Sequence, residues 1–335
     1  MKVDVSAEQA LDPTSAVSAE EQGYDAVWFG ETSHDPSVSI ALAAQTTSRV
    51  QLGTGVTIAL ARSPMTLAVT ANDLQLISEG RLLLGLGSQV KAHITRRFSM
   101  PWVQPIAQMR EFVLALRAIW RSWHEGEQLD FQGDYYSHTL MTPFFNPGPN
   151  PYGPAPVLLA GIGAKMTGLA GEVADGFMCH GFATERYLRE VVVPSLRAGR
   201  AKTGRDLDGF EISGLPFVVT GANEEQMVAA AVGVREQIAF YAATPAYRPV
   251  LELHGWGELQ TELNAMSKAG RWKEMGGLID DEVLNAFAVV AEPDKVAAEV
   301  LNRYGDLFTR LHLYLKTEID HDLLSTIRAQ LQGDA

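Results

Sequence analysis

The segment Gly161-Ile162-Gly163-Ala164-Lys165 contains the residue types that point most directly to ligand binding. It follows an apolar run that ends at Ala160 and precedes a helical pattern, so it should connect a strand to the first turn of a helix. Free backbone N–H groups and the helix dipole at such a turn favour an anion, and Lys165 adds positive charge. We therefore interpret the segment as a phosphate site, with a tight turn that binds no ligand as the alternative.

A second group of polar side chains follows the apolar run at 24–30. Glu31, Thr32 and His34 come directly after this run. A histidine in such a place can exchange a proton or donate a hydrogen bond to a cofactor edge. The alternative for His34 is a capping or packing role, and the same two interpretations apply, with a weaker signal, to His93 and His180.

Other motifs receive less support. Gly85-Leu86-Gly87 lacks the third glycine of a dinucleotide-binding loop. Cys179 and His180 are neighbours on a predicted strand and would point to opposite faces, so they do not form a nucleophile–base pair. The sequence contains no His-x-His, HExxH or cysteine cluster, and we predict no metal site.

A basic cluster follows the glycine pair at 85–87. Lys91, Arg96 and Arg97 lie in a polar connection at the expected active-site end of the fold. Because the chain as a whole is acidic, this local positive charge could bind an anionic tail of a ligand. A solvated loop is the alternative.

The elements that must position these residues are clearest between Arg49 and Gly87. An apolar run at 50–58, rich in β-branched residues, precedes Ser63-Pro64, which is typical of a helix start. Gly80 ends that helix, and a second apolar run at 82–84 leads into Gly85-Leu86-Gly87. Both predicted strands carry paired glycines, which would allow the backbone to approach a ligand closely.

The same alternation extends over the whole chain and predicts a (β/α)8 TIM barrel in a single domain, 1–335. Insertions are expected at about 88–104, 124–155 and 243–288, the last of them helical. A doubly wound sheet is disfavoured because the turn after the first strand has no glycine. The predicted strands lie at 2–5, 24–30, 50–58, 82–84, 157–160, 176–181, 210–220 and 309–315, and the predicted helices at 7–23, 36–48, 64–79, 106–123, 164–174, 184–199, 223–241, 293–304 and 320–330.

Composition excludes several classes of function. The 335 residues carry a formal net charge of -13, which argues against a nucleic-acid-binding protein. No apolar run is long enough to span a membrane, and the N-terminus lacks the apolar region of a signal peptide. One cysteine among 335 residues permits no intrachain disulfide, so we expect a cytoplasmic protein.

Three segments carry a family resemblance. RVQLGTGVTIALARSPMTLAVTANDLQLISEGRLLLGLG and VLLAGIGAKMTGLAGEVADGF resemble the two signature segments of the luciferase-like flavin and deazaflavin oxidoreductases. YDAVWFGETSHDP is similar to their second-strand segment and is closest to the branch that uses coenzyme F420, a deazaflavin. The resemblance implies a TIM barrel with the cofactor at the C-terminal ends of the strands.

The resemblance also implies roles for individual residues. A non-prolyl cis peptide, here Gly55–Val56, would support the middle ring of the cofactor. The phosphate would bind at the Gly161–Lys165 turn, and Gln89 and His93 would reach the ribityl chain and the ring edge. The implied cofactor-binding set is Thr54, Gly55, Val56, Gly87, Gln89, His93, Ala160, Gly161, Ile162, Gly163, Ala164 and Lys165.

One departure affects the catalytic group. Many F420 enzymes carry Ser-Asp-His where this chain has Gly30-Glu31-Thr32, so threonine stands in the place of the histidine. This argues against a sugar-phosphate dehydrogenase mechanism that depends on that base. Glu31, Thr32 and His34 remain the catalytic candidates.

We therefore expect an F420-dependent oxidoreductase that transfers a hydride to or from a small organic substrate. Because the family often dimerises, a homodimer is expected. The alternatives are an FMN-dependent monooxygenase supplied by a separate flavin reductase, and a flavin-binding barrel without catalysis. A hydrolytic barrel would need paired carboxylates at the strand ends, where only Glu31 is clearly placed.

Overall fold

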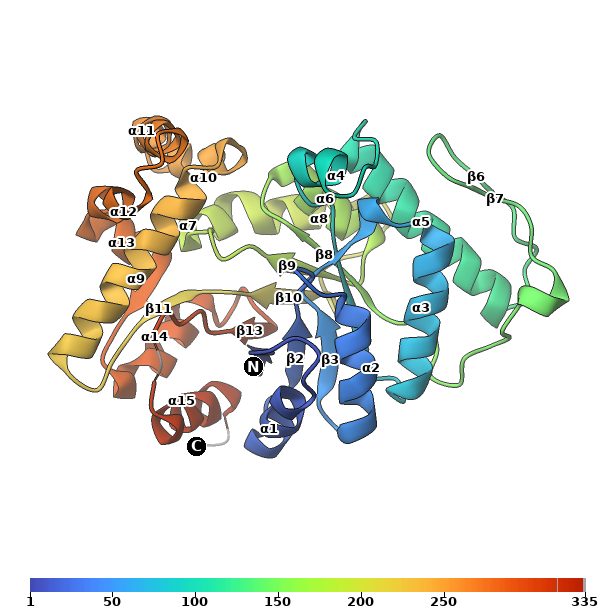
Figure 1. Ribbon diagram of the computed structural model, residues 1–335, viewed down its shortest axis with the longest axis horizontal. Coiled ribbons are helices and arrows are strands. Elements are labelled where there is room, and N and C mark those ends of the chain that lie inside the picture. The colour runs from blue at the N-terminus through green and yellow to red at the C-terminus, as the bar shows by residue number, and fades with distance from the viewer. Residues whose placement is uncertain (318, 334–335) are drawn as a thin grey trace.

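Eight parallel strands close into a barrel in the computed structural model, which describes residues 1–317 and 319–333 (Figure 1). Their order around the barrel is β3-β2-β1-β13-β10-β9-β8-β5, and pairing of β3 with β5 closes the ring. This confirms the predicted TIM barrel. The strands are β1 (Lys2–Ser6), β2 (Ala26–Phe29), β3 (Gln51–Thr54), β5 (Leu82–Gly87), β8 (Val157–Gly161), β9 (Gly176–Cys179), β10 (Glu211–Gly214) and β13 (Arg310–His312).

Helices surround the barrel, and many of them bury apolar residues between themselves and the strands or neighbouring helices. In α5, for example, Met109, Phe112 and Leu116 are fully buried at helical spacing. The helices are α1 (Thr14–Gln22), α2 (Pro36–Thr46), α3 (Pro64–Ile77), α4 (Lys91–Arg96), α5 (Pro105–His124), α6 (Ala164–Val173), α7 (Glu185–Tyr187), α8 (Val193–Ala201), α9 (Glu224–Ala242), α10 (Arg248–Leu253), α11 (Gly257–Lys268), α12 (Trp272–Met275), α13 (Asp281–Phe287), α14 (Pro293–Tyr304) and α15 (His321–Gln332). None of the helices in the described part of the chain is both long and apolar enough to cross a bilayer.

Helix starts follow the local signals in the sequence. The Asp35 carboxylate accepts a hydrogen bond from the Ser37 N–H at the start of α2, and Ser63 Oγ accepts one from the Thr66 N–H at the start of α3. In both helices a proline occupies the first position, where its missing N–H costs nothing. The predicted starts of these two helices are confirmed.

The observed elements differ from the predicted ones in several places. The first helix begins at Thr14 rather than residue 7, because Pro13 disfavours helical geometry at Asp12, whose carboxylate instead accepts the Thr14 N–H at 2.9 Å. The helix predicted at 184–199 contains a π-helical turn, Leu188–Val192, just before Pro194. The predicted strand at 210–220 stops at Gly214.

The chain resumes after Pro216 as β11 (Phe217–Val219), which pairs with β12 (Ala288–Val290) and bridges to Tyr314, two residues beyond β13. Strand β12 was not predicted, since only its distant partner reveals it. The segments at 88–104 and 124–155 are also less irregular than expected. The first contains α4, and the second contains a short hairpin of β6 (Phe131–Gln132) and β7 (Ser137–His138). Elsewhere, the short strand β4 (Thr57–Ile58) follows β3 within the predicted third strand.

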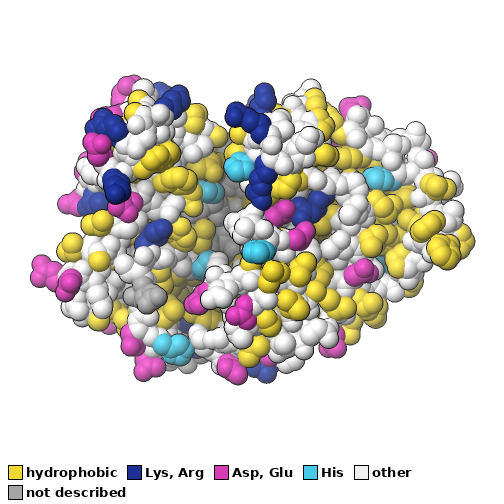
Figure 2. All heavy atoms as spheres, viewed as in Figure 1, with side chains coloured by type: hydrophobic (Ala, Val, Ile, Leu, Met, Phe, Trp, Pro, Cys, Tyr) yellow, Lys and Arg dark blue, Asp and Glu magenta, His cyan; other side chains and the backbone are white. Residues whose placement is uncertain are grey.

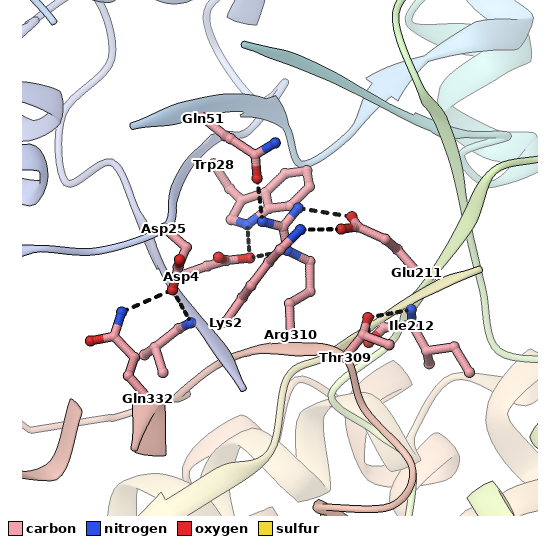
Figure 3. Close-up of polar contacts among 11 residues, drawn as sticks. Lys2, Asp4, Asp25, Trp28, Gln51, Glu211, Ile212, Thr309, Arg310 and Gln332 are labelled. Carbon is pink, nitrogen blue, oxygen red and sulfur yellow. Dashed lines mark hydrogen bonds and ion pairs between the residues drawn. The ribbon is translucent and has the colours of Figure 1, made fainter. Parts of the chain in front are cut away.

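A buried ionic network fills the barrel at the N-terminal ends of its strands (Figure 3). Arg310 is fully buried, with its Nε 2.9 Å from Asp4 Oδ2, and it donates to Glu211 at 3.1 Å and to Gln51 at 2.8 Å. Trp28 Nε1–H donates to the same Asp4 oxygen at 2.8 Å. This network fills the barrel interior at that end, so we expect a ligand of the barrel to bind at the opposite, C-terminal end.

Candidate functional site

The proposed phosphate turn lies at the C-terminal end of β8, as predicted, and opens α6. Gly163 is the residue before the first helical turn, and no side chain caps the N–H groups of that turn. A Cβ built on Gly163 would meet no atom within 4 Å, so the space beside it is open. Ala164 and Lys165 are exposed. An uncapped helix start beside open space fits a phosphate oxygen group.

Hydrogen bonds to the carbonyl groups of the turn fix its backbone. The Tyr187 hydroxyl donates to the carbonyl oxygen of Ile162 at 3.0 Å, and Thr167 Oγ1 donates to that of Gly163 at 3.1 Å. Gly161 must be small because a Cβ there would lie 2.8 Å from Met166 Cγ. The turn is therefore rigid while its N–H groups remain open.

A cis peptide bond joins Gly55 to Val56, as the family resemblance implied. It lies at the C-terminal end of β3, where Gly55 is exposed and Thr54 is buried. Thr54 Oγ1 donates to the Gly85 carbonyl at 2.7 Å, and the Gly55 N–H donates to that of Phe29 at 2.8 Å. Backbone is thus presented to the barrel mouth at this strand end, which fits a flat ring.

Close packing, rather than ligand binding, explains the other glycines near the strand ends. A Cβ on Gly53 would lie 2.2 Å from the Trp28 ring, and one on Gly85 would lie 2.0 Å from the Thr54 carbonyl oxygen. A Cβ on Gly87 would lie 2.7 Å from Val56 Cγ2. Packing alone requires glycine at these positions, so their presence is not evidence of a ligand.

We expect Gly85→Ala to destabilise the protein strongly. The added methyl group would overlap the Thr54 carbonyl and approach Met178 Sδ at 2.7 Å, and a backbone atom cannot move aside as a flexible side chain can. Overpacking of this kind costs about 1–3 kcal/mol or more, measurable by urea denaturation. Gly163→Ala is the matched control and should unfold like the wild type. Equal stability of the two variants would contradict the packing interpretation.

Of the predicted catalytic residues after β2, Glu31 is fixed by hydrogen bonds, and the other two are exposed. The Glu31 carboxylate accepts from the Arg62 guanidinium at 2.8 Å and from the Ile58 N–H at 2.7 Å, and Arg62 also pairs with Asp35 at 2.9 Å. Thr32 and His34 are exposed. These contacts favour a role for Glu31 in fixing the segment after the cis peptide.

Gln89 and His93, predicted to reach the cofactor, lie beside the mouth. Gln89 has a positive φ of 59°, and its side-chain oxygen accepts the Val90 N–H at 2.9 Å. His93 is exposed on α4. Arg97, at the end of the same helix, donates to the Thr32 carbonyl and so ties α4 to the segment after β2.

An aromatic wall lines another side of the mouth, and sequence reasoning gave it little weight. His180 follows the end of β9, two residues beyond Met178, so continued strand alternation would direct both side chains to the same side. Met178 Cε is 3.9 Å from the Cβ position of Gly55. The His180 ring packs against Tyr241 and Tyr247, with ring centroids 4.7 and 4.8 Å apart. The inward alternation of β9 marks His180, but only the folded chain brings α9 and the segment after it alongside.

The hydrogen bonds of His180 define its tautomer. The Phe182 N–H donates to Nδ1 at 3.0 Å, so the neutral ring carries its hydrogen on Nε2, which lies 3.3 Å from the Tyr247 hydroxyl oxygen. Burial lowers the pKa of His180 to about 4, which keeps the ring neutral at physiological pH. Tyr247 can therefore accept from His180 and use its own hydrogen to donate to a bound molecule.

A hollow is visible in the space-filling view between the side formed by α9–α11 and the side formed by α4 (Figure 2). Basic side chains gather over α4 at its rim, and histidines border it. No group of three or more His, Cys, Asp or Glu residues that could hold a metal ion occurs in residues 1–317 and 319–333.

Comparisons with known proteins agree with this geometry. The sequence profile of the luciferase-like monooxygenase family matches residues 12–310. An uncharacterized protein of Mycobacterium tuberculosis is 52% identical over 89% of this chain and 87% of its own length. An F420-dependent glucose-6-phosphate dehydrogenase of Kineococcus radiotolerans is 32% identical over 57% of this chain and 58% of its own.

Among solved structures, the coenzyme F420-dependent tetrahydromethanopterin reductase of Methanopyrus kandleri has the same fold. It superposes with a TM-score of 0.77 at 20% identity, over 98% of this chain and 96% of that one.

Proposed function

Because this chain belongs to the luciferase-like monooxygenase family, we propose that it is an oxidoreductase that binds coenzyme F420 in the barrel mouth and acts on a small organic substrate. When bound, a deazaflavin supplies two-electron hydride chemistry. The residues of this chain then have to bind it, orient it and exclude water.

One observation carries the proposal: an uncapped helix start beside open space and the exposed backbone at Gly55 occupy the same end of the barrel. The N–H groups of the first α6 turn, with Lys165, would hold the phosphate. Gly55 and Val56 would press on the ring. The choice of a deazaflavin is supported by the 32% identical relative that is an F420-dependent dehydrogenase.

We further propose that the substrate lies between the cofactor ring and the aromatic wall of His180, Tyr241 and Tyr247. Aromatic faces and one neutral hydrogen-bonding pair favour a neutral, partly apolar molecule rather than a phosphate ester. Tyr247, oriented by His180, is placed to donate a hydrogen bond to its polar group. Glu31 would act by fixing the cofactor-supporting segment, while Thr32 and His34 would contact the substrate from the opposite rim.

Titration of the purified protein with F420 and with FMN, each followed by quenching of cofactor fluorescence, tests the choice of cofactor. We expect F420 to bind in the micromolar range and FMN to bind much more weakly. Binding of FMN alone, with oxygen consumption when a flavin reductase supplies reduced FMN, would instead identify a two-component monooxygenase. Tight F420 binding without turnover of any enone, alcohol or imine would indicate a barrel that binds the cofactor without catalysis.

We also propose that the protein is a homodimer that pairs through α2 and α3. These two helices pack side by side, and each leaves large apolar side chains exposed to solvent. Figure 2 shows apolar side chains gathered over this region and over the loop before β8. The exposed residues are Val38, Leu42, Val69, Leu76 and Ile77 on the helices and Leu140, Phe144 and Phe145 in the loop. Exposed apolar side chains gathered in this way are typical of a subunit interface.

The double variant Leu42→Asp/Leu76→Asp should shift the protein from dimer to monomer in light-scattering measurements, because two carboxylates per subunit would be buried in an apolar interface. Val228→Asp/Val232→Asp, at exposed apolar positions of α9, is the control and should stay dimeric. A wild type that is monomeric at micromolar concentration would refute the dimer.

A further inference from the structure

A surface groove begins at the proposed phosphate turn and continues along the outside of the barrel. It encloses about 940 Å³ between the first turn of α5, the length of α6 and one face of α8. These helices pack beside one another (Figure 1). Ala164 and Lys165 line one end, and Glu172 lines it seven residues further along α6, which is about 10 Å at 1.5 Å per residue.

The floor of the groove is made of backbone and short side chains. Helices α6 and α8 approach so closely that a Cβ on Gly199 would lie 2.0 Å from the Gly168 carbonyl oxygen. Ser195 and Ala198 continue the floor along α8. Longer side chains, among them Leu169 and Glu172, also line the groove, and about 940 Å³ remains beside them for an extended chain.

The charged residues of the groove are mostly basic, although the chain as a whole has a net charge of -13. They are the cations Lys165, Arg110 and Lys202 and a single carboxylate, Glu172. Glu172 bridges two of the cations, at 2.5 Å from Arg110 Nε and 2.8 Å from Lys202 Nζ. Positive charge therefore lies at the phosphate end and again about 10 Å further on, by the helical rise.

We propose that this groove binds the oligoglutamate tail of coenzyme F420, an inference that rests on the proposed function. The tail is a chain of carboxylates attached beyond the phosphate, so it must leave the site next to Lys165. A few glutamyl units, each at least as long as the about 3.5 Å of an extended peptide residue, reach Arg110 and Lys202. Those cations would then pair with tail carboxylates as well as with Glu172.

The basic cluster on α4 is the competing location. There Arg97 already donates to the Thr32 carbonyl and lies over the Phe98 ring at 4.8 Å, which leaves Lys91 and Arg96 for a ligand. The groove combines a continuous open path, cations at both ends and direct continuity with the proposed phosphate turn. We therefore place the tail in the groove.

The test compares three ligands by fluorescence titration: the deazaflavin alcohol without phosphate, the phospholactyl form without glutamate, and oligoglutamyl F420. At low salt the oligoglutamyl form should bind about tenfold more tightly than the glutamate-free form, the order expected for a few partly exposed ion pairs. The difference should largely disappear at about 0.5 M salt, where such pairs are screened.

Variants locate the effect. Arg110→Gln/Lys202→Gln keeps hydrogen-bond donors for Glu172 but removes two charges. The ratio of the affinity for oligoglutamyl F420 to that for the glutamate-free form, here called the tail advantage, should then fall to about twofold. Glu172→Gln removes the competing carboxylate and should raise the advantage about threefold, a gain that misfolding cannot imitate. Lys91→Gln/Arg96→Gln on α4 is the matched control and should leave it unchanged.

Equal affinity for the glutamate-free and oligoglutamyl forms, or a loss confined to the α4 variant, would overturn the groove while leaving the proposed function intact. Failure of every deazaflavin form to bind the wild type would overturn both.

Discussion

Gly163→Asp should weaken F420 binding about a hundredfold, equivalent to about 2.7 kcal/mol, while leaving the protein as stable as the wild type or slightly more so. Gly163 has extended backbone angles, φ -80° and ψ 148°, which suit an N-cap residue of any type, and the space beside it is open. Aspartate there would accept hydrogen bonds from the first turn of α6 and favour its dipole. The same carboxylate would occupy the phosphate position and repel the phosphate.

Two measurements made together check this prediction: a thermal unfolding curve and an F420 titration. The deazaflavin alcohol without phosphate is the control ligand, and its affinity should hardly change. Gly163→Ala should weaken F420 binding far less, since it adds no charge. Wild-type F420 affinity in Gly163→Asp would show that the phosphate binds elsewhere.

Arg310→Met should destabilise the protein by about 3–5 kcal/mol at about pH 8, as measured by urea denaturation. Arg310 is fully buried and pairs with Asp4 at 2.9 Å, and methionine offers neither charge nor hydrogen bonds to replace it. Glu211 keeps its ion pair with Lys2 at 2.5 Å, so the main loss falls on Asp4 and Gln51. Cofactor affinity of the folded fraction should stay normal, since the network lies on the barrel floor.

The pH dependence of this loss follows from Asp4. Burial raises the pKa of its carboxyl to about 7 against the opposing effect of Arg310. A raised carboxyl pKa means that the folded protein binds the proton more tightly, so Asp4 contributes stability at low pH that is lost as the pH rises toward 7. Without Arg310 this pKa rises further, so Arg310→Met should be less harmful at about pH 5 than at about pH 8.

Asp4→Asn/Arg310→Met should recover part of the lost stability at high pH, because no carboxyl group then has to stay protonated. Asp4→Asn alone should flatten the fall in unfolding free energy between about pH 4 and 7. If Arg310→Met lowered the free energy of unfolding equally at every pH, ionisation of Asp4 could not be the cause of the loss.

Local residue patterns were enough to predict many of the features that depend on neighbouring residues. Ser63-Pro64 and Asp35-Pro36 mark helix starts because a capping oxygen and a proline act within one turn. The buried runs at 82–84 and 157–160 predict strands because the apolar residues alone show that both faces are covered. The strand-to-helix turn at Gly161–Lys165 was predicted by a local motif, and the cis peptide at Gly55–Val56 was implied by the family resemblance.

The tertiary structure decided whatever requires residues far apart in the chain. Gly85 is glycine because of Thr54, Glu31 is held by Arg62, and His180 is oriented toward Tyr247, 67 residues away. Arg310 and Asp4 meet only because β13 pairs with β1 to complete the barrel. Local propensity and periodicity carry no information about such partners. Only the closing of the sheet brings these strand ends together. The sequence therefore shows where the glycines are, but it does not show which contact requires glycine at each position.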